Sequence, residues 1–126
     1  MRDHLKQMIE QYIRAYNAFD VAGMTEHLHE DIVFENLSDG QVDLSTRGIA
    51  AFRQQAELAK GFFSQREQKI TGWEVKDDRI TIQVDYHGIL AVDLPQGMKA
   101  GETLQLRGQS TFTFRDGQIV KIQDES

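Results

Sequence analysis

Several helices and strands expected from this sequence have an apolar face that one or two polar residues interrupt. These polar residues are the first candidates for a catalytic or binding role. Tyr12 and Tyr16 lie four residues apart in IEQYIRAYNAFD (residues 9–20), on the apolar stripe of an expected helix. Each phenol either donates a hydrogen bond to a ligand or packs its ring and sends the hydroxyl to a nearby carbonyl or water. Ser110 interrupts an apolar strand face, and its buried hydroxyl needs a partner, expected to be a backbone neighbour or water.

A carboxyl group near the end of the chain is the candidate for a base. Val120, Ile122 and Asp124 alternate along the last expected strand, so Asp124 continues an inward row. Desolvation among aromatic residues would raise the pKa of this carboxyl toward a value useful for proton transfer. The alternative is a solvated acidic tail, as terminal runs such as QDES usually are. The catalytic candidates are therefore Tyr12 and Asp124.

Three helical segments precede the strands that must position these residues. Apolar spacings of three and one predict a helix from Asp3 to Phe19. Asp20 is expected to end this helix and cap a short second one, VAGMTEHL. Ser45 or Thr46 is expected to cap a third helix over residues 48–63, with a buried face formed by Ile49, Phe52, Ala56, Ala59 and Phe63.

Alternating patterns predict strands over residues 29–37, 41–47, 67–75, 79–92, 103–114 and 118–126. Asp39-Gly40 and Asp116-Gly117 stand between alternating runs, as in tight hairpins. Helices first and strands afterwards indicate an α+β fold, with the helices on one face of a mostly antiparallel sheet. The other face is polar and can meet water or a partner; it carries Thr81, Gln83, Asp85, His87, Gln105, Arg107 and Gln109.

Composition narrows the function classes. The 126 residues predict a single domain over 1–126, and 40% hydrophobic residues are typical of a globular chain. A net charge of -6 without a basic stripe argues against nucleic acid and anionic membranes as partners. The chain has no cysteine, no phosphate loop and no dinucleotide motif, so neither a metal nor a cofactor is expected. His27, His29 and Asp31 share no face and are interpreted as surface residues, and the expected location is the cytoplasm.

Along the chain, in this order and spacing, come the stretches IEQYIRAYNAFD, HEDIVFEN, RGIAAFR, YHG and FTFRDGQIVKI. This order of elements, with these residues, resembles the nuclear transport factor 2-like superfamily. The stretch YHGILAVDLPQGMKAGETLQLRGQSTFTFRDGQIV looks most like the SnoaL-like branch of polyketide cyclases and their relatives. The resemblance implies a cone, in which a curved sheet wraps a helix and opens at one end into an apolar pocket. It also implies a homodimer, expected to form through the polar sheet face.

Within this superfamily, the resemblance to ketosteroid isomerases implies catalytic roles for three positions of this sequence. Their oxyanion-binding tyrosine falls on Tyr12, their general base on Asn36 and their second oxyanion donor on Ser110. An amide has no useful basicity, so Asn36 cannot take a proton, and a serine is not a carboxylic acid kept neutral by burial. The resemblance therefore implies the shape of an isomerase pocket without the isomerase reaction. Asn36 either opens the turn that follows or orients a ligand oxygen.

The sequence thus predicts a protein that binds a small, largely apolar molecule carrying a carbonyl, phenol or hydroxyl. If the protein is an enzyme, proton transfer next to a carbonyl is expected, as in an isomerase, cyclase or lyase. The alternative is a non-catalytic dimeric module that binds a metabolite or a protein. Asn36 and Ser110 join Tyr12 as polar handles, and the expected lining is Tyr12, Tyr16, Phe34, Phe52, Ile82, Val84, Phe112 and Phe114.

Overall fold

Three helices and one six-stranded sheet make up the computed structural model, which describes residues 2–95 and 97–126. The elements are α1 (Arg2–Asn17), α2 (Val21–Met24), β1 (Leu28–Ser38), β2 (Gln41–Arg47), α3 (Ile49–Lys60), β3 (Phe63–Lys76), β4 (Arg79–Leu90), β5 (Thr103–Arg115) and β6 (Gln118–Glu125). The strand order is β2-β1-β6-β5-β4-β3. Only the pair of β1 and β6 is parallel among the described strand pairs. The predicted α+β class with a mostly antiparallel sheet is confirmed.

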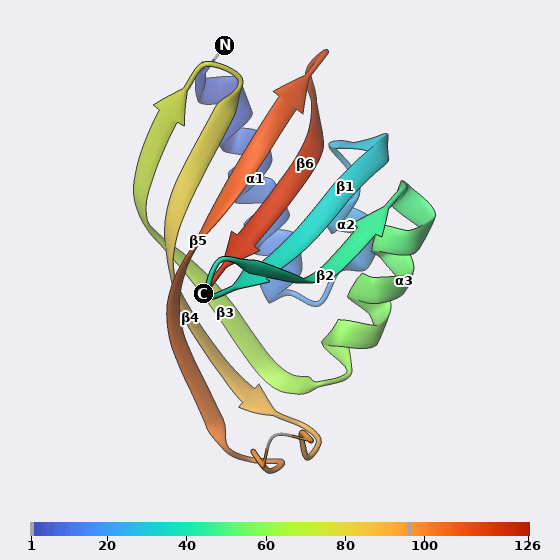
Figure 1. The fold of residues 1–126 in the computed structure, drawn as a ribbon, viewed down its shortest axis with the longest axis vertical. Coiled ribbons are helices and arrows are strands. Elements are labelled where there is room, and N and C mark those ends of the chain that lie inside the picture. Colours follow the sequence, from blue (N-terminus) through green and yellow to red (C-terminus); the bar gives the residue numbers. More distant parts are fainter. Residues whose placement is uncertain (1, 96) are drawn as a thin grey trace.

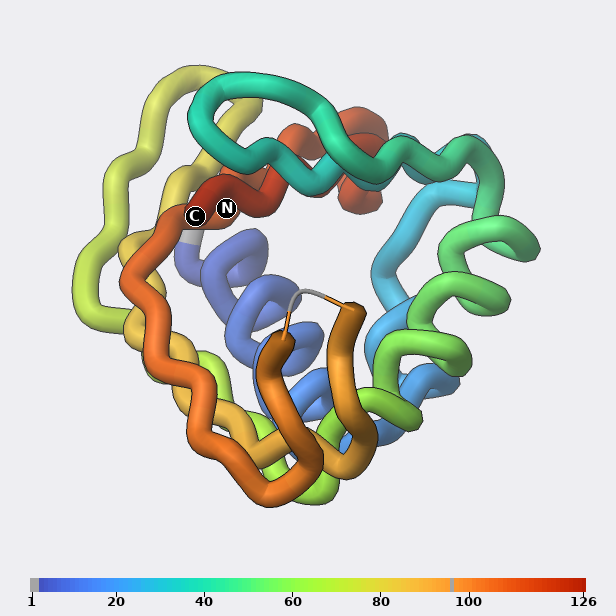
Figure 2. Tube along the Cα trace, turned by 60° about the horizontal axis from the view of Figure 1, so that its bottom comes forward, coloured from blue at the N-terminus to red at the C-terminus, as the bar shows by residue number. Residues whose placement is uncertain are grey.

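The sheet curves around α1, which lies along its concave face (Figure 1). Seen from one end, α1 runs through the middle of the molecule, with the sheet on one side and α3 on the other (Figure 2). No helix within the described residues is both long enough and apolar enough to span a bilayer.

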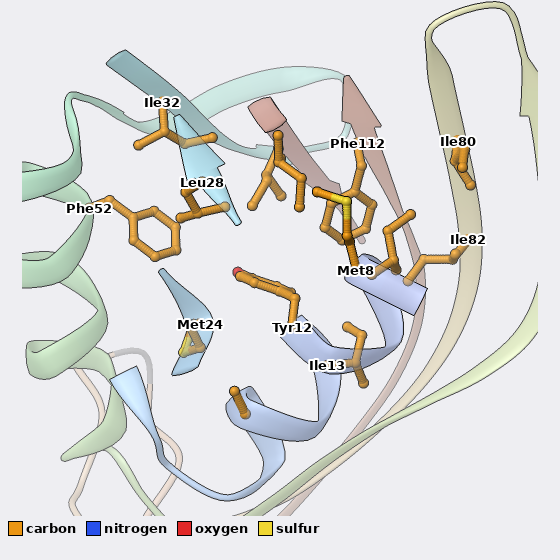
Figure 3. Close-up of a cluster of buried hydrophobic side chains, with 14 of the residues drawn as sticks. Met8, Tyr12, Ile13, Met24, Leu28, Ile32, Phe52, Ile80, Ile82 and Phe112 are labelled. Atoms are coloured by element: carbon orange, nitrogen blue, oxygen red, sulfur yellow. The ribbon is translucent and has the colours of Figure 1, made fainter. Parts of the chain in front are cut away.

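The core lies between α1 and the concave face of the sheet. Met8, Ile9, Tyr12 and Ile13 are buried, as the helical spacing predicted. These α1 side chains belong to one buried cluster with the sheet residues Ile32, Ile80, Ile82 and Phe112. The close-up shows how α1 and the strands surround this cluster (Figure 3). This packing fixes α1, and with it the tyrosine, relative to the strands.

The two predicted hairpin turns and the predicted helix cap are present in the structure. Asp39-Gly40 has φ of 53° and 78°, and Asp116-Gly117 has φ of 54° and 76°. These left-handed pairs suit tight hairpins, so both predicted turns are confirmed. Asp20 also caps α2 as predicted, because its Oδ1 accepts a hydrogen bond from the Gly23 backbone N–H at 3.0 Å.

The structure corrects the predicted bounds of the third helix and the predicted inward row of the last strand. Ser45 and Thr46 belong to β2, and α3 begins after Gly48, whose φ of 90° places it in the left-handed region without a side-chain cap. Phe63 opens β3 and does not belong to α3. In β6 the pairing with β5 shifts between Phe114 and Thr113, so Ile119 is fully buried while Val120 is only partly buried. The inward row on β6 is therefore Ile119, Ile122 and Asp124.

Candidate functional site

Three of the predicted polar residues form one row across the sheet. In the parallel pair Asn36 lies opposite Asp124, and in the antiparallel pair Ser110 lies opposite Asp124. Directly paired residues point to the same side of a sheet. The row therefore places an amide, a carboxyl and a hydroxyl side by side, although they come from positions 36, 124 and 110.

Asp124 is the ionisable member of this row. The Ser110 hydroxyl donates a hydrogen bond to Asp124 Oδ1 at 2.7 Å, so this hydroxyl has a side-chain acceptor that the sequence did not predict. Burial raises the pKa of Asp124 to about 6, against a smaller lowering by the Ser110 bond. A carboxyl with this pKa is largely ionised at neutral pH and still basic enough to accept a proton.

Two cavities meet at this row. The inner cavity, of about 200 Å³, lies between α1, α3 and the sheet, and the outer cavity, of about 370 Å³, lies over β4, β5 and β6. Tyr16, Asn36 and Asp124 line both cavities. A ligand that occupied either cavity could therefore approach the Asp124 carboxyl.

Tyr12 presents its hydroxyl to the inner cavity. The residue is 5% exposed, and its ring packs edge-on to Phe112 with 5.6 Å between ring centroids. The hydroxyl points away from α1, toward the space bounded by Phe52, Leu28 and Met24 (Figure 3). No hydrogen bond among the described side chains involves this hydroxyl. Burial and the nearby Asp124 raise the pKa of Tyr12 well above its ordinary value, so the phenol stays neutral and able to donate.

Tyr16 differs from Tyr12 because its hydroxyl already has a partner. The Tyr16 and Tyr86 hydroxyls lie 2.8 Å apart, and their rings are arranged edge to face. Burial raises the pKa of Tyr16. The hydrogen bond with Tyr86 and the charge of Arg66 lower this pKa and so offset part of the increase. The second tyrosine of the opening helix therefore closes one wall of the cavities.

Some of the residues expected to line a pocket do line one of the two cavities, and the others are packed in the hydrophobic core. Phe34 and Phe52 line the inner cavity, and Val84 and Ser110 line the outer one. Ile82, Phe112 and Phe114 line neither of these cavities, because they pack against α1 in the core. The Asn36 amide donates to Asp43 Oδ1 at 2.9 Å, so one of its N–H groups is committed to β2.

Arg66 is a wall residue that the sequence analysis missed. It is 6% exposed, lies on β3 and lines the inner cavity. The alternating pattern predicts a strand that begins at residue 67 and leaves Arg66 outside it, whereas β3 begins at Phe63. Extending the alternation of Gln68 and Ile70 back by two residues would have placed a cation on the inward face.

No metal site is evident within the described part of the chain, where no three His, Cys, Asp or Glu side chains cluster. His29 accepts a hydrogen bond from the Asp31 backbone N–H at 3.0 Å through Nδ1. The chemistry that the arrangement offers is therefore that of a carboxylate, a neutral phenol and a buried guanidinium around an apolar space.

Comparison with known proteins adds a family and a set of similar structures. The family model of the SnoaL-like domain matches residues 9–122. A putative polyketide cyclase from Xanthomonas campestris pv. campestris is 23% identical and superposes with a TM-score of 0.83, covering 99% of this chain and 91% of that one. No curated protein matches the chain.

Two further similar structures contain small molecules. A protein with a ketosteroid isomerase-like fold from Catenulispora acidiphila DSM 44928, in complex with trimethylamine, is 14% identical with a TM-score of 0.76 and coverage of 93% and 82%. TerC, co-crystallised with polyporic acid, is 17% identical with a TM-score of 0.72 and coverage of 94% and 87%. At these identities the similar structures establish the fold, and the family model confirms the resemblance to SnoaL-like proteins that the sequence indicates.

Proposed function

The chain belongs to the SnoaL-like domain family, and we propose that its cone binds a small, largely apolar molecule and transfers a proton next to a carbonyl or phenol oxygen of that molecule. One observation carries this proposal. A carboxyl with a raised pKa, Asp124, and an uncommitted phenol hydroxyl, that of Tyr12, line the same apolar cavity. Such a pair supplies a base and a hydrogen-bond donor without a metal or a cofactor.

Each group has a defined task in this reaction. Asp124 takes a proton from the carbon next to the ligand carbonyl, and the electron pair of the broken C–H bond moves onto the carbonyl oxygen. The Tyr12 O–H donates a hydrogen bond to that oxygen as its negative charge develops. The Ser110 hydroxyl holds Asp124 Oδ1, which orients the carboxylate. Return of the proton to another carbon gives isomerisation, and attack of the enolate on a second carbonyl gives cyclisation.

The similar proteins support a small-molecule pocket. One is named a putative polyketide cyclase, and the two ligand-bound structures hold trimethylamine and polyporic acid. A ligand in the cavities of this chain would meet aromatic and aliphatic walls with few polar groups, as in most small-molecule sites.

A thermal-shift screen against phenols, cyclic ketones and hydroxylated aromatic compounds tests the proposal. A ligand at about 100 times its dissociation constant adds roughly 2.7 kcal/mol of stability, which is a readable change in Tm for a domain of this size. In Tyr12→Phe the shift from a carbonyl ligand should fall strongly, because the donor is lost. Tyr86→Phe is the matched control, since its hydroxyl is paired with Tyr16 and its loss should reduce the shift less.

Two outcomes of this screen contradict the proposal. If no compound changes the wild-type Tm, the proposed ligand pocket is contradicted. If a compound shifts the Tm of wild type and Tyr12→Phe equally, the role of Tyr12 as a hydrogen-bond donor is contradicted.

The pH dependence of turnover tests the base. Turnover of a compound that binds should decline below about pH 6, as Asp124 becomes protonated. A rate that stayed constant through this range would remove Asp124 as the base.

A non-catalytic dimeric module is the second candidate function. Its interface would be the polar face of the sheet, which points away from α1. That face carries a hollow of about 420 Å³ bordered by charges of both signs, Glu67, Lys69, Asp85 and Arg107. Charges of both signs allow self-complementary pairing with a second copy across a two-fold axis. Light scattering during size exclusion should then report a dimer that Arg107→Glu weakens. A wild-type monomer at micromolar concentration would exclude this interface.

A further inference from the structure

Arg66 is a buried cation held in a fixed position. Its guanidinium lies over the Tyr16 ring at 3.7 Å from the centroid and near the Phe19 ring at 4.5 Å. Its Nε donates a hydrogen bond to the Tyr16 carbonyl oxygen at 2.9 Å. Two aromatic rings and one carbonyl thus fix the plane of the guanidinium, so its direction does not depend on a mobile side chain.

The charge of Arg66 has no anionic partner in the described part of the chain. None of the ion pairs there includes Arg66, and its Nη2 is buried without a hydrogen-bond acceptor. Buried charges in proteins are normally paired, because the loss of hydration has to be compensated. Asp124, the carboxyl that lines the same cavity, accepts its hydrogen bond from Ser110 instead.

The guanidinium belongs to the wall of the inner cavity. Most of the remaining wall comes from side chains such as Met24, Phe34 and Phe52, which offer no charge. The charge of Arg66 acts on the Tyr12 hydroxyl, because it lowers the pKa of that phenol against the effect of burial. The cation and the free phenol therefore face a common space.

We propose that the ligand of the inner cavity carries a carboxylate and that Arg66 binds it. This inference rests on the proposed function and narrows the substrate class to apolar carbonyl or phenol compounds that are also carboxylic acids. An arginine N–H donates a charge-assisted hydrogen bond to a carboxylate oxygen, which is shorter and stronger than a hydrogen bond between neutral groups. With the carboxylate at Arg66 and the carbonyl oxygen at Tyr12, Asp124 remains free to act as the base.

Binding of three neutral or anionic probes with one ring system tests this assignment. The probes are naphthoate, naphthamide and acetonaphthone, titrated calorimetrically into wild type, Arg66→Gln and Arg66→Lys near neutral pH, where a simple carboxylic acid is ionised. Arg53→Gln is the matched control, because Arg53 is exposed on α3. Wild type should bind naphthoate about tenfold or more tightly than naphthamide, since a charge-assisted hydrogen bond is stronger than a neutral one.

The variants separate the carboxylate site from the pocket itself. Arg66→Gln should abolish the preference for naphthoate while acetonaphthone binding changes little, and Arg66→Lys should retain part of the preference. Equal binding of naphthoate and naphthamide to wild type overturns the carboxylate assignment but leaves the proposed function in place if acetonaphthone binds. Failure of all three probes to bind wild type overturns both. If Arg66→Gln does not fold, the wild-type preference and its change in Arg66→Lys still decide the question.

Discussion

The concave face of the sheet has two halves that differ in composition although they share the same strands. In the closed half, Ile32, Ile80, Phe112 and Ile122 are fully buried in the core that α1 covers. The same inward rows carry Asn36 four residues beyond Ile32 on β1, Asp124 two residues beyond Ile122 on β6 and Ser110 two residues before Phe112 on β5. Three strands thus switch from apolar to polar side chains at one register.

This difference separates stability from chemistry. The closed half buries large side chains without polar groups, which is how a core gains most of its stability. The open half keeps a carboxyl in a partly buried position where the charged form is disfavoured, as the raised pKa of Asp124 shows. Truncation of an apolar side chain in the closed half and neutralisation of the carboxyl in the open half should therefore have opposite effects on stability, and this expectation can be tested directly.

Truncation in the closed half should give the largest effect. Phe112→Ala is expected to lower the free energy of unfolding by about 3–5 kcal/mol, because a fully buried ring leaves a cavity. Urea denaturation of the purified variant measures this loss. Phe34→Ala is the comparison variant on the wall of the inner cavity, where the ring is only partly buried and its loss should cost less. Equal losses for the two variants would contradict the division into halves.

Neutralising the carboxyl in the open half should stabilise the protein. Asp124 has a folded-state pKa of about 6 against an ordinary 3.8, so the folded state binds the proton more tightly. Its contribution to stability is present below the ordinary pKa and is lost as the pH rises through about 6. Asp124→Asn should therefore gain roughly 3 kcal/mol near pH 8 and almost nothing near pH 3.

Urea denaturation at several pH values checks this gain, and any activity should disappear in the same variant. Glu125→Gln is the matched control, since this neighbouring carboxyl is exposed and its loss should leave the pH dependence in place. A stability of Asp124→Asn that fell below wild type near pH 8 would show that the carboxylate is not desolvated.

Removing the serine that holds the carboxyl should have the smallest effect. The Ser110 hydrogen bond lowers the pKa of Asp124, so Ser110→Ala should raise this pKa further. The loss of stability should be about 1 kcal/mol, typical of one hydrogen bond. The carboxyl resonance of Asp124, followed by NMR during a pH titration, reports the midpoint. An unchanged or lower midpoint would show that Ser110 does not stabilise the ionised carboxylate.

Local patterns in the sequence determined most of the fold. The apolar spacing in α1, the cap at Asp20 and the left-handed pairs Asp39-Gly40 and Asp116-Gly117 were all predictable. Each depends on residues within about four positions of one another, where the backbone period or a single φ angle selects the residue type. The inward side of Asn36, Ser110 and Asp124 followed from alternation in the same way, although their mutual contacts did not.

Only the tertiary structure decided how these residues meet. Ser110 reaches Asp124 because the β5–β6 register puts them opposite each other, and the shift near Thr113 sets which β6 residues face inward. Arg66 meets Tyr16 across 50 positions because the curved sheet brings β3 against α1. Register and curvature result from packing summed over whole strands, so no short stretch of the sequence contains them. For that reason the sequence could name the tyrosine and the carboxyl of this site, while the position of the Arg66 guanidinium against the Tyr16 and Phe19 rings was decided only by the tertiary structure.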